Sequence, residues 1–464
     1  MKFLIFVGLI AVLIGYGYLK FDELTRPLPL PTFDTNKYWG PGDGSKYKED
    51  KTITPFKIQI DPKIITDLRQ QLNRTLKLTE PLEGVNFEYG YNTEAMSQVV
   101  TYWRDSYLTK WKQREMVLNE LPQYTTEIQG LKIHFIHAKP TAEAQHKKKV
   151  LPLLLLHGWP GSVREFYDFI PILTEPAEVT EYVFEVVAPS LVGYGWSDAA
   201  RKVGFNAAEM AIVMRNLMLR LGFEKFLVQG GDWGSIIGSN IATIFPENVL
   251  GYHSNMCVLQ TPLAIMKSIV ANFYPEKFIP SRFFTEHHFP LSEKLKFLLE
   301  ESGYFHIQAT KPDTIGTALL TSPIGLASFY IEKFQTGISP AHSQRFDGIT
   351  KVFTIDAILD NIMIYYLSNT ATTSARFYKE NMSKAYRDLK LERVQSPVPM
   401  GCARFRFDLP SVMDWQLMDK FPNLIHSKYF NQVGHFAAFE APVMLYIDFA
   451  EFVNKIEFKK GEDQ

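Results

Sequence analysis

A glycine-rich pentapeptide, Gly230-Gly231-Asp232-Trp233-Gly234, constrains the fold of this chain more than any other stretch. A β-rich run at 226–229 leads into it, and an apolar helical pattern at 235–245 leads out of it. A strand, a tight glycine-rich turn and a helix together form a nucleophile elbow, usually written G-x-S-x-G. The glycines suit a sharp turn whose central residue is strained. Here that residue is an aspartate, whose carboxylate attacks an alkyl carbon and becomes an ester, whereas a serine attacks an acyl carbon. The alternative interpretation is a glycine-rich turn with an ordinary surface aspartate, so the rest of the chain has to decide.

The segments around this turn alternate between strand-like and helix-like patterns. Runs at 151–156 and 183–188 are short and continuously apolar, which is typical of strands buried on both faces. Residues 206–209 have the form of a capping box that opens a helix. Such alternation predicts a parallel sheet. Residues 260–390 are mostly helical and aromatic, which predicts a cap inserted over the sheet, and sheet-like patterning resumes at 395–454.

The N-terminal run 3–19 holds no charged residue. Its length is at the short end of what spans a bilayer as a helix. A cleaved signal peptide would need a small-x-small site after the run. Instead the run ends in Tyr16, Tyr18 and Lys20, which resemble interfacial anchors. The sequence therefore predicts an uncleaved membrane anchor, and the flanking charges give only a weak bias for its orientation.

These patterns predict an α/β-hydrolase fold with an inserted helical cap and an N-terminal extension that carries the anchor. The length of 464 residues suits one large decorated domain or a few units. The predicted segments are the anchor at 1–20, an extension wrapping the core at 21–149, the first part of the core at 150–260, the helical cap at 261–392 and the second part of the core at 393–464.

The bulk composition excludes several classes of protein. A net charge of −1 gives no electrostatic case for nucleic-acid binding. The chain has two cysteines, Cys257 and Cys402, which provide no disulfide framework and fit a reducing compartment. This favours a catalytic body on the cytosolic side of the membrane. Cysteine and histidine show no metal-ligand spacing, so no metal site is expected.

An alkyl ester has to be hydrolysed, which requires a base that activates water and an acid that orients the base. In this fold the order along the chain is nucleophile, acid, histidine. The natural base is His435, which follows a strand-like stretch. Asp408 follows another strand-like stretch and is the favoured acid, while Asp414 and Asp419 are alternatives in a predicted helix.

The tetrahedral intermediate of ester hydrolysis needs backbone N–H donors directed at its oxyanion. One donor comes from the residue after the nucleophile, here Trp233, and the other from a loop after an earlier strand. The loop 157–161 follows the leucine-rich strand, so we assign the second donor to Trp159. A cis Trp159–Pro160 bond would fit a tight turn at this place.

Four motifs in the expected order, at 157–162, 193–197, 230–235 and 434–440, resemble those of the microsomal epoxide hydrolase family of the α/β-hydrolase superfamily. The likeness extends over nearly the whole chain, and within the family it is greatest to the insect juvenile hormone epoxide hydrolases. The resemblance implies hydrolysis of a lipophilic epoxide to a vicinal diol, without cofactor or metal, by an enzyme anchored in the endoplasmic reticulum membrane.

The resemblance also implies roles for residues that spacing alone does not select. Its two cap tyrosines, which donate hydrogen bonds to the epoxide oxygen, match Tyr304 in 301–304 and Tyr378 in 376–381. It supports Asp408 as the orienting acid, at a position where mammalian members tend to carry glutamate. The physiological substrate, a terpenoid hormone epoxide or diverse foreign epoxides, and the oligomeric state stay open at this point.

Two other functions compete with epoxide hydrolysis. A haloalkane dehalogenase uses the same elbow with aspartate but requires halide-binding N–H donors and no paired phenols. An inactive member of the family would act as a lipophilic-hormone binding protein, which the complete set of candidate catalytic residues disfavours. A serine esterase is disfavoured because Ser235 lies on the first turn of the helix and not at the elbow.

Overall fold

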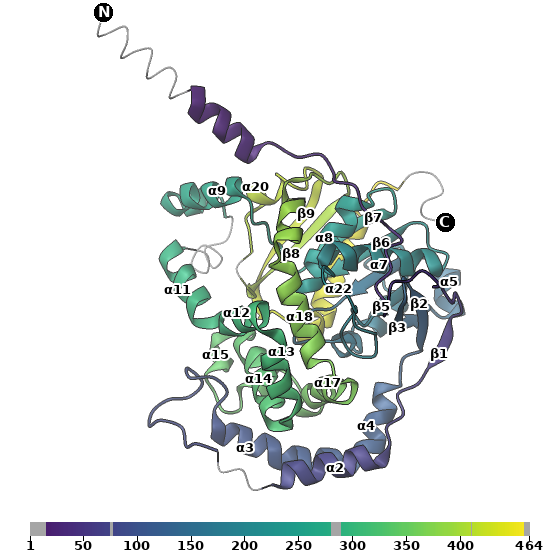
Figure 1. The fold of residues 1–464 in the computed structure, drawn as a ribbon. Helices are drawn as coiled ribbons and strands as arrows, with labels where there is room; N and C mark the ends of the chain where they lie inside the picture. Colours follow the sequence, from purple (N-terminus) through teal and green to yellow (C-terminus); the bar gives the residue numbers. More distant parts are fainter. Residues whose placement is uncertain (1–14, 75–77, 280–288, 410, 459–464) are drawn as a thin grey trace, which may run out of the picture.

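The computed structural model describes residues 15–74, 78–279, 289–409 and 411–458, which form a central sheet, a helical cap and an N-terminal extension around them (Figure 1). The described residues contain one nine-stranded sheet in the order β1-β2-β3-β5-β4-β6-β7-β8-β9. Its strands are β1 (Thr54–Phe56), β2 (Gln123–Ile128), β3 (Leu131–Ala138), β4 (Lys149–Leu156), β5 (Tyr182–Pro189), β6 (Phe226–Gly230), β7 (Val249–Ser254), β8 (Met400–Phe407) and β9 (Leu424–Gly434).

The sheet is mixed. Strands β1, β2 and β3 pair antiparallel, β3 also pairs antiparallel with β5, and all pairings from β5 through β4 to β9 are parallel. The parallel part confirms the predicted α/β-hydrolase fold. The short strand β1 was not predicted. Strands β5 and β6 flank β4 on opposite sides, and the carboxyl ends of strands beside such a change of direction are where ligands bind in α/β folds.

Helices cover both faces of the sheet. Helices α7 (Ala207–Arg220) and α8 (Trp233–Ile244) contact each other on one face, and α6 (Ile170–Thr174) and α22 (Pro442–Val453) contact each other on the other. Alternate residues of β4 divide between two apolar clusters: Leu154 packs with the α7 and α8 side chains, and Leu153 with those of α6 and α22. This explains why the strand is continuously apolar.

The cap lies between β7 and β8 in sequence. It consists of α9 (Pro262–Phe273), η4 (Pro275–Lys277), α11 (Leu291–Glu301), α12 (Gly303–Thr310), α13 (Pro312–Leu320), α14 (Pro323–Thr336), α15 (Pro340–Ser343), α16 (Gly348–Val352), α17 (Ile355–Ser368), α18 (Ala371–Asn381), α19 (Lys384–Leu389) and η5 (Leu391–Arg393). Short helices α20 (Asp414–Leu417) and α21 (Ala437–Glu440) follow β8 and β9.

The extension passes along the outer side of the cap through α2 (Pro62–Asn73), α3 (Thr93–Tyr102), η1 (Trp103–Tyr107), η2 (Leu108–Lys110) and α4 (Trp111–Leu118), at the bottom of Figure 1. A buried carboxylate joins three parts of the molecule. Asp360 on α17 accepts hydrogen bonds from Tyr107 (2.8 Å) and Arg114 (2.5 Å) of the extension, and from Arg164 of the core (3.0 Å). Its side chain has no exposed surface.

Most of the predicted anchor lies outside the described residues. The described part begins with a helix at 15–25 that projects from the body (Figure 1). Within the described ranges, no single helix combines the length and the apolar character needed to cross a bilayer.

The two cysteines are joined in a disulfide, contrary to the expectation that they form no such link. Cys257 follows β7 and Cys402 lies in the neighbouring strand β8, with a Cα–Cα distance of 6.2 Å. They are separated by 145 residues in the sequence, so only the pairing of the two strands brings them together. Because disulfides persist mainly in oxidising compartments, the cysteine count no longer favours a reducing one.

Candidate active site

The predicted elbow joins β6 to α8. Asp232 adopts φ 48° and ψ −128°, a left-handed conformation that is costly for a side chain with a Cβ. The flanking glycines allow close approach of other groups. A Cβ on Gly234 would lie 2.1 Å from the carbonyl oxygen of Leu156, and one on Gly231 would lie 2.4 Å from the Asn255 amide. The turn therefore requires glycine at these positions and presents Asp232 at the carboxyl edge of the sheet.

The structure brings three of the predicted residues into one line. His435 Nε2 lies 3.4 Å from Asp232 Oδ2, and His435 Nδ1 lies 2.5 Å from Asp408 Oδ1. Asp408 follows β8 and His435 follows β9, so adjacent strands deliver them to the same edge. The backbone N–H of His435 donates to the carbonyl of Gly337 at the end of α14 (2.8 Å), which holds the loop against the cap.

The two alternative acids point elsewhere. Asp414 accepts a hydrogen bond from Ser427 (2.7 Å) and pairs with Arg404 (2.8 Å), while Asp419 pairs with Lys267 (2.7 Å). Asp408 is thus the carboxylate of the three that contacts the imidazole.

The surroundings of these three side chains shift the pKa values of His435 and Asp408. Burial lowers the pKa of His435, but the charge of Asp408, together with hydrogen bonds to Asp232 and Asp408, outweighs burial and raises that pKa well above its ordinary value. Burial raises the pKa of Asp408, against the opposing effect of the imidazolium. The arrangement therefore favours a charged imidazole as long as both carboxylates are ionised.

The loop after β4 supplies an N–H at the elbow. The backbone N–H of Trp159 donates to Asp232 Oδ1 at 2.8 Å, and the Trp159–Pro160 bond is cis, as predicted. Helix α17 fixes this loop: Asn361 Nδ2 donates to the Pro160 carbonyl (2.7 Å) and the Tyr365 hydroxyl to the Gly161 carbonyl (2.6 Å). Trp233, the other predicted donor, begins α8 directly after Asp232.

Two cap helices hold the predicted tyrosines above the nucleophile. The ring of Tyr304 on α12 stacks on Trp159 at 5.1 Å between centroids, and Tyr378 on α18 meets Trp233 edge to face at 4.9 Å. The two phenol rings are 6.1 Å apart. Burial raises the pKa of both hydroxyls, and the Asp232 carboxylate raises each further, so both are neutral phenols. Among the described residues, neither hydroxyl donates to a side-chain or backbone acceptor.

A cavity of about 550 Å³ extends from Asp232 between core and cap. Both tyrosines line it, together with mostly apolar side chains of α9, α11 and α12. Its size and lining are those of a site for a small lipophilic ligand with a few polar groups at one end.

A second, small cavity of about 20 Å³ is lined by both Asp232 and His435. Glu165, Gln229 and Asn255 contribute polar groups to its lining. The volume is enough for one water molecule, and the number of polar neighbours is what a buried water requires.

Glu165 is the site residue that sequence reasoning missed. Burial raises its pKa to about 8, although the charge of His435 acts in the opposite direction. Its carboxylate lies so close to Gly161 that a Cβ there would collide with it. The only sequence signal is Ser162-Val-Arg-Glu165, a capping-box pattern at the start of η3 (Val163–Phe166), which gives Glu165 a purely local role.

Among the residues that the structure describes, no group of three or more His, Cys, Asp or Glu side chains could hold a metal ion. What the geometry does provide is a strained carboxylate, an imidazole and a second carboxylate in one line, with an N–H donor and two phenols around the first carboxylate. Fold and site together define the class: an α/β-hydrolase whose elbow carries aspartate in place of serine.

Comparison with known proteins agrees with this class. A family model described as "Epoxide hydrolase N terminus" matches residues 53–166, and one described as "alpha/beta hydrolase fold" matches residues 152–290. Juvenile hormone epoxide hydrolase 1 of Ctenocephalides felis is 46% identical over 459 residues, which cover 98% of this chain and 97% of that protein. Epoxide hydrolase 1 of Oryctolagus cuniculus is 39% identical, with 97% and 98% covered.

Among solved structures, the crystal structure of juvenile hormone epoxide hydrolase from the silkworm Bombyx mori superposes with a TM-score of 0.88 at 39% identity. The match covers 91% of this chain and 99% of that one. The chain therefore belongs to the epoxide hydrolase family, and it is an epoxide hydrolase. This confirms the resemblance inferred from the four motifs.

Proposed function

We propose that the chain hydrolyses a lipophilic epoxide, juvenile hormone or a related terpenoid epoxide, to the vicinal diol through an ester of Asp232. The observation that carries the proposal is the Asp232–His435–Asp408 line at the end of a mostly apolar cavity that two neutral phenols also line. A ring-opening reaction needs a nucleophile below the ring and proton donors above it, and this arrangement offers both.

In the first step, a carboxylate oxygen of Asp232 attacks the less hindered ring carbon. The bond between that carbon and the ring oxygen breaks, and the electron pair stays on the oxygen. Tyr304 and Tyr378 donate hydrogen bonds to this oxygen, and one of them transfers its proton, because an alkoxide is a poor leaving group.

In the second step, a water molecule in the small cavity loses a proton to His435 and attacks the carbonyl carbon of the ester. The N–H groups of Trp159 and Trp233 stabilise the oxyanion, and Asp408 stabilises the imidazolium. The ester C–O bond then breaks and the diol oxygen takes the proton from His435. Asp232, which is left as a carboxylic acid, loses its proton to solvent, and the tyrosinate regains one from solvent, so that every group returns to its starting state. Glu165 forms a hydrogen bond with the attacking water, either as the acceptor of a water proton or as the donor of its own.

The substrate assignment rests on the names of the relatives and on the size of the cavity. A terpenoid epoxide is a long apolar molecule, and about 550 Å³ of mostly apolar volume lies within the range of small-molecule sites. The test compares kcat/KM for juvenile hormone with kcat/KM for styrene oxide, a small aromatic epoxide. A higher value for the hormone supports the assignment, and a higher value for styrene oxide points instead to a broad role with foreign epoxides.

The reaction type is tested with the same preparation. Diol formation is measured beside halide release from a chloroalkane, and binding of the epoxide is measured for the Asp232→Asn variant. The unaltered chain is expected to form the diol and to release no halide. The Asp232→Asn variant is expected to bind the epoxide without turning it over. Halide release would favour a dehalogenase, and binding without any diol from the unaltered chain would favour an inactive hormone carrier.

We also infer that segment 3–19 attaches the enzyme to the endoplasmic reticulum membrane, and that the five segments defined from the sequence are its structural units, with strands β1, β2 and β3 of the second segment completing the core sheet. The support is the uncharged apolar run at 3–19, whose last residues form the start of the exposed helix at 15–25. Resistance of the full-length chain to extraction from microsomes by alkaline carbonate is the expected result, and release into the supernatant would contradict it.

A further inference from the structure

A cluster of large apolar side chains lies exposed on two cap helices. Six apolar side chains of α9 and α11 are at least half exposed, and we call them the α9–α11 face: Ile265 (60%), Ile269 (50%), Val270 (50%), Phe273 (71%), Leu295 (60%) and Leu299 (81%). Single exposed apolar residues are common, but a group of this size marks an interaction surface. The two helices are joined where Asn272 Oδ1 accepts the N–H of Leu291 (2.9 Å).

The catalytic cavity reaches the surface at this face. Ile265 of α9 and Leu298 of α11 both line the cavity that contains Asp232 and the two phenols. The same two side chains are 60% and 39% exposed. A side chain that lines a cavity and is also exposed marks its mouth, so the mouth lies within the apolar surface.

The helix at 15–25, which begins within the N-terminal apolar run, meets the body close to this face. Arg393 donates to the carbonyls of Glu23 (2.7 Å) and Arg26 (2.9 Å), at the end of the helix at 15–25. Lys420, in the segment that follows α20, donates a hydrogen bond to the carbonyl of Leu391, which lies two residues before Arg393 (2.6 Å). Lys267 on α9 donates to Asp419 in that same region (2.7 Å). These contacts connect α9 to the C-terminal end of the helix at 15–25.

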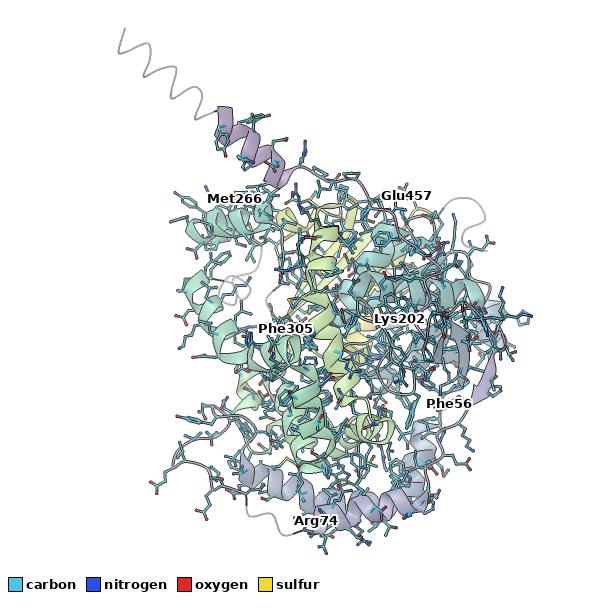
Figure 2. All side chains as sticks on the ribbon, viewed as in Figure 1. Phe56, Arg74, Lys202, Met266, Phe305 and Glu457 are labelled. Carbon is cyan, nitrogen blue, oxygen red and sulfur yellow. A yellow bond between two sulfur atoms is a disulfide. The ribbon has the colours of Figure 1, made fainter. Side chains whose placement is uncertain are left out.

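The figures agree with this placement. The helix at 15–25 and α9, where Met266 is labelled in Figure 2, lie at the top left of the molecule. Helices α2, α3 and α4 lie at the opposite side, where Arg74 is labelled. The helix at 15–25 is itself exposed and carries Tyr16, Tyr18, Leu19, Phe21 and Leu24 on its surface.

We propose that the α9–α11 face lies in the interfacial layer of a lipid bilayer, so that the mouth of the catalytic cavity opens toward the membrane. A bilayer is the occupant that fits, because the helix at 15–25 meets the body near α9, and attachment of the apolar run that this helix continues would hold the face against a membrane. Basic and aromatic residues border the face as they do at membrane surfaces, with Lys277 over the ring of Tyr274 (5.1 Å). Lipophilic epoxides then pass from lipid into the cavity without crossing water.

The contact with lipid is measured on the full-length chain in phosphatidylcholine vesicles. Ile269→Cys and Phe273→Cys are each labelled with the polarity-sensitive fluorophore NBD, because the two native cysteines are joined in a disulfide. Met116→Cys is the matched control, because Met116 is 73% exposed and belongs to α4, a helix that lies at the opposite side of the molecule in Figure 1. Labels at 269 and 273 are expected to shift to shorter wavelength and to be quenched by brominated lipid, and the label at 116 is not. Water-like emission at all three positions would overturn the proposal.

The delivery of substrate depends on the lipophilic substrate proposed above, whereas lipid contact does not. An Ile269→Glu/Phe273→Glu variant alters the face at positions that do not line the cavity. It is expected to lose at least ~5-fold in kcat/KM for an epoxide dissolved in the vesicles and nothing for a small water-soluble epoxide, with Met116→Glu as control. An equal loss for both epoxides, or no loss for either, would overturn delivery through this face. If the unaltered chain turned over neither epoxide, the proposed reaction would fail while the fluorescence result still decided lipid contact.

Discussion

Replacing Asp408 with asparagine removes the charge that faces His435 and keeps the size of the side chain. Asp408 Oδ1 lies 2.5 Å from His435 Nδ1, and its side chain is buried. A hydrogen bond to a charged group is worth about 1.5–3 kcal/mol, which corresponds to a rate about 10- to 150-fold lower where that bond stabilises the transition state. Asparagine can also hold the imidazole in the wrong tautomer, so this range is a lower limit.

The lower rate is expected in only one step of the reaction, the hydrolysis of the ester. Attack of Asp232 on the epoxide needs no base, so the rate of ester formation stays as in the unaltered chain. Hydrolysis of the ester needs His435 as a base and slows by the stated factor. Both kcat and KM then fall together, because the ester accumulates during turnover.

Single-turnover stopped-flow fluorescence separates the two steps. Trp159 donates its backbone N–H to Asp232 at 2.8 Å and Trp233 follows Asp232 directly, so indole emission reports the formation and decay of the ester. Asp414→Asn is the matched control, since Asp414 pairs with Arg404 away from the imidazole. Hydrolysis at the unaltered rate in Asp408→Asn, or equal slowing of both steps, would refute the assignment of Asp408.

Other parts of the site and fold give further tests. Tyr304→Phe and Tyr378→Phe each keep the ring packing and should slow ester formation by about 10²–10³, with little effect on ester hydrolysis; slowing of hydrolysis alone would contradict their role. Glu165→Gln should slow ester hydrolysis by about 2- to 12-fold, the worth of one hydrogen bond to the attacking water, and leave ester formation unchanged in the same stopped-flow assay. Ester hydrolysis requires neutral His435, so its rate falls as the pH falls through the pKa of His435. Because the Asp408 charge raises that pKa, the acid limb of the single-turnover hydrolysis rate should move to lower pH in Asp408→Asn. A shift of the acid limb to higher pH would contradict the assignment. Asp360→Ala leaves two arginines without their buried carboxylate and should lower the free energy of unfolding in urea by about 3–5 kcal/mol, whereas a stability change below about 1 kcal/mol would show that the network contributes little.

Local signals made the elbow and the sheet predictable. The glycines around Asp232 are required by contacts within the turn and with the adjacent strand, so their spacing survives as a recognisable motif. The strand β4 is buried on both faces and is continuously apolar for that reason. The helix that starts after Asn206 has the N-cap of the predicted capping box, since the side chain of Asn206 accepts N–H groups of the first turn. The reciprocal half of the box is absent, because Glu209 pairs with Lys37 and the Asn206 N–H donates to the Gly204 carbonyl.

Features that depend on distant contacts were not predictable from local pattern. The sequence favoured Asp408 because it follows a strand-like stretch, but it left Asp414 and Asp419 open, since only the end of β8 decides which carboxylate reaches the imidazole beside β9. The disulfide depends on β7 lying next to β8. Glu165 carries a pattern that already has a local explanation, so its place beside the small cavity emerges only when the loop after β4 meets the loop after β9.

The formation of a covalent ester at Asp232 is the central claim, and isotope transfer from water tests it most directly. The enzyme in excess over epoxide completes one turnover in ¹⁸O-water, and the peptide that contains Asp232 is then analysed by mass spectrometry together with the diol. Attack of water on the ester carbonyl predicts one ¹⁸O in the Asp232 side chain and none in the diol. An unlabelled Asp232 peptide with ¹⁸O in the diol would show that water attacks the epoxide directly, which contradicts the account.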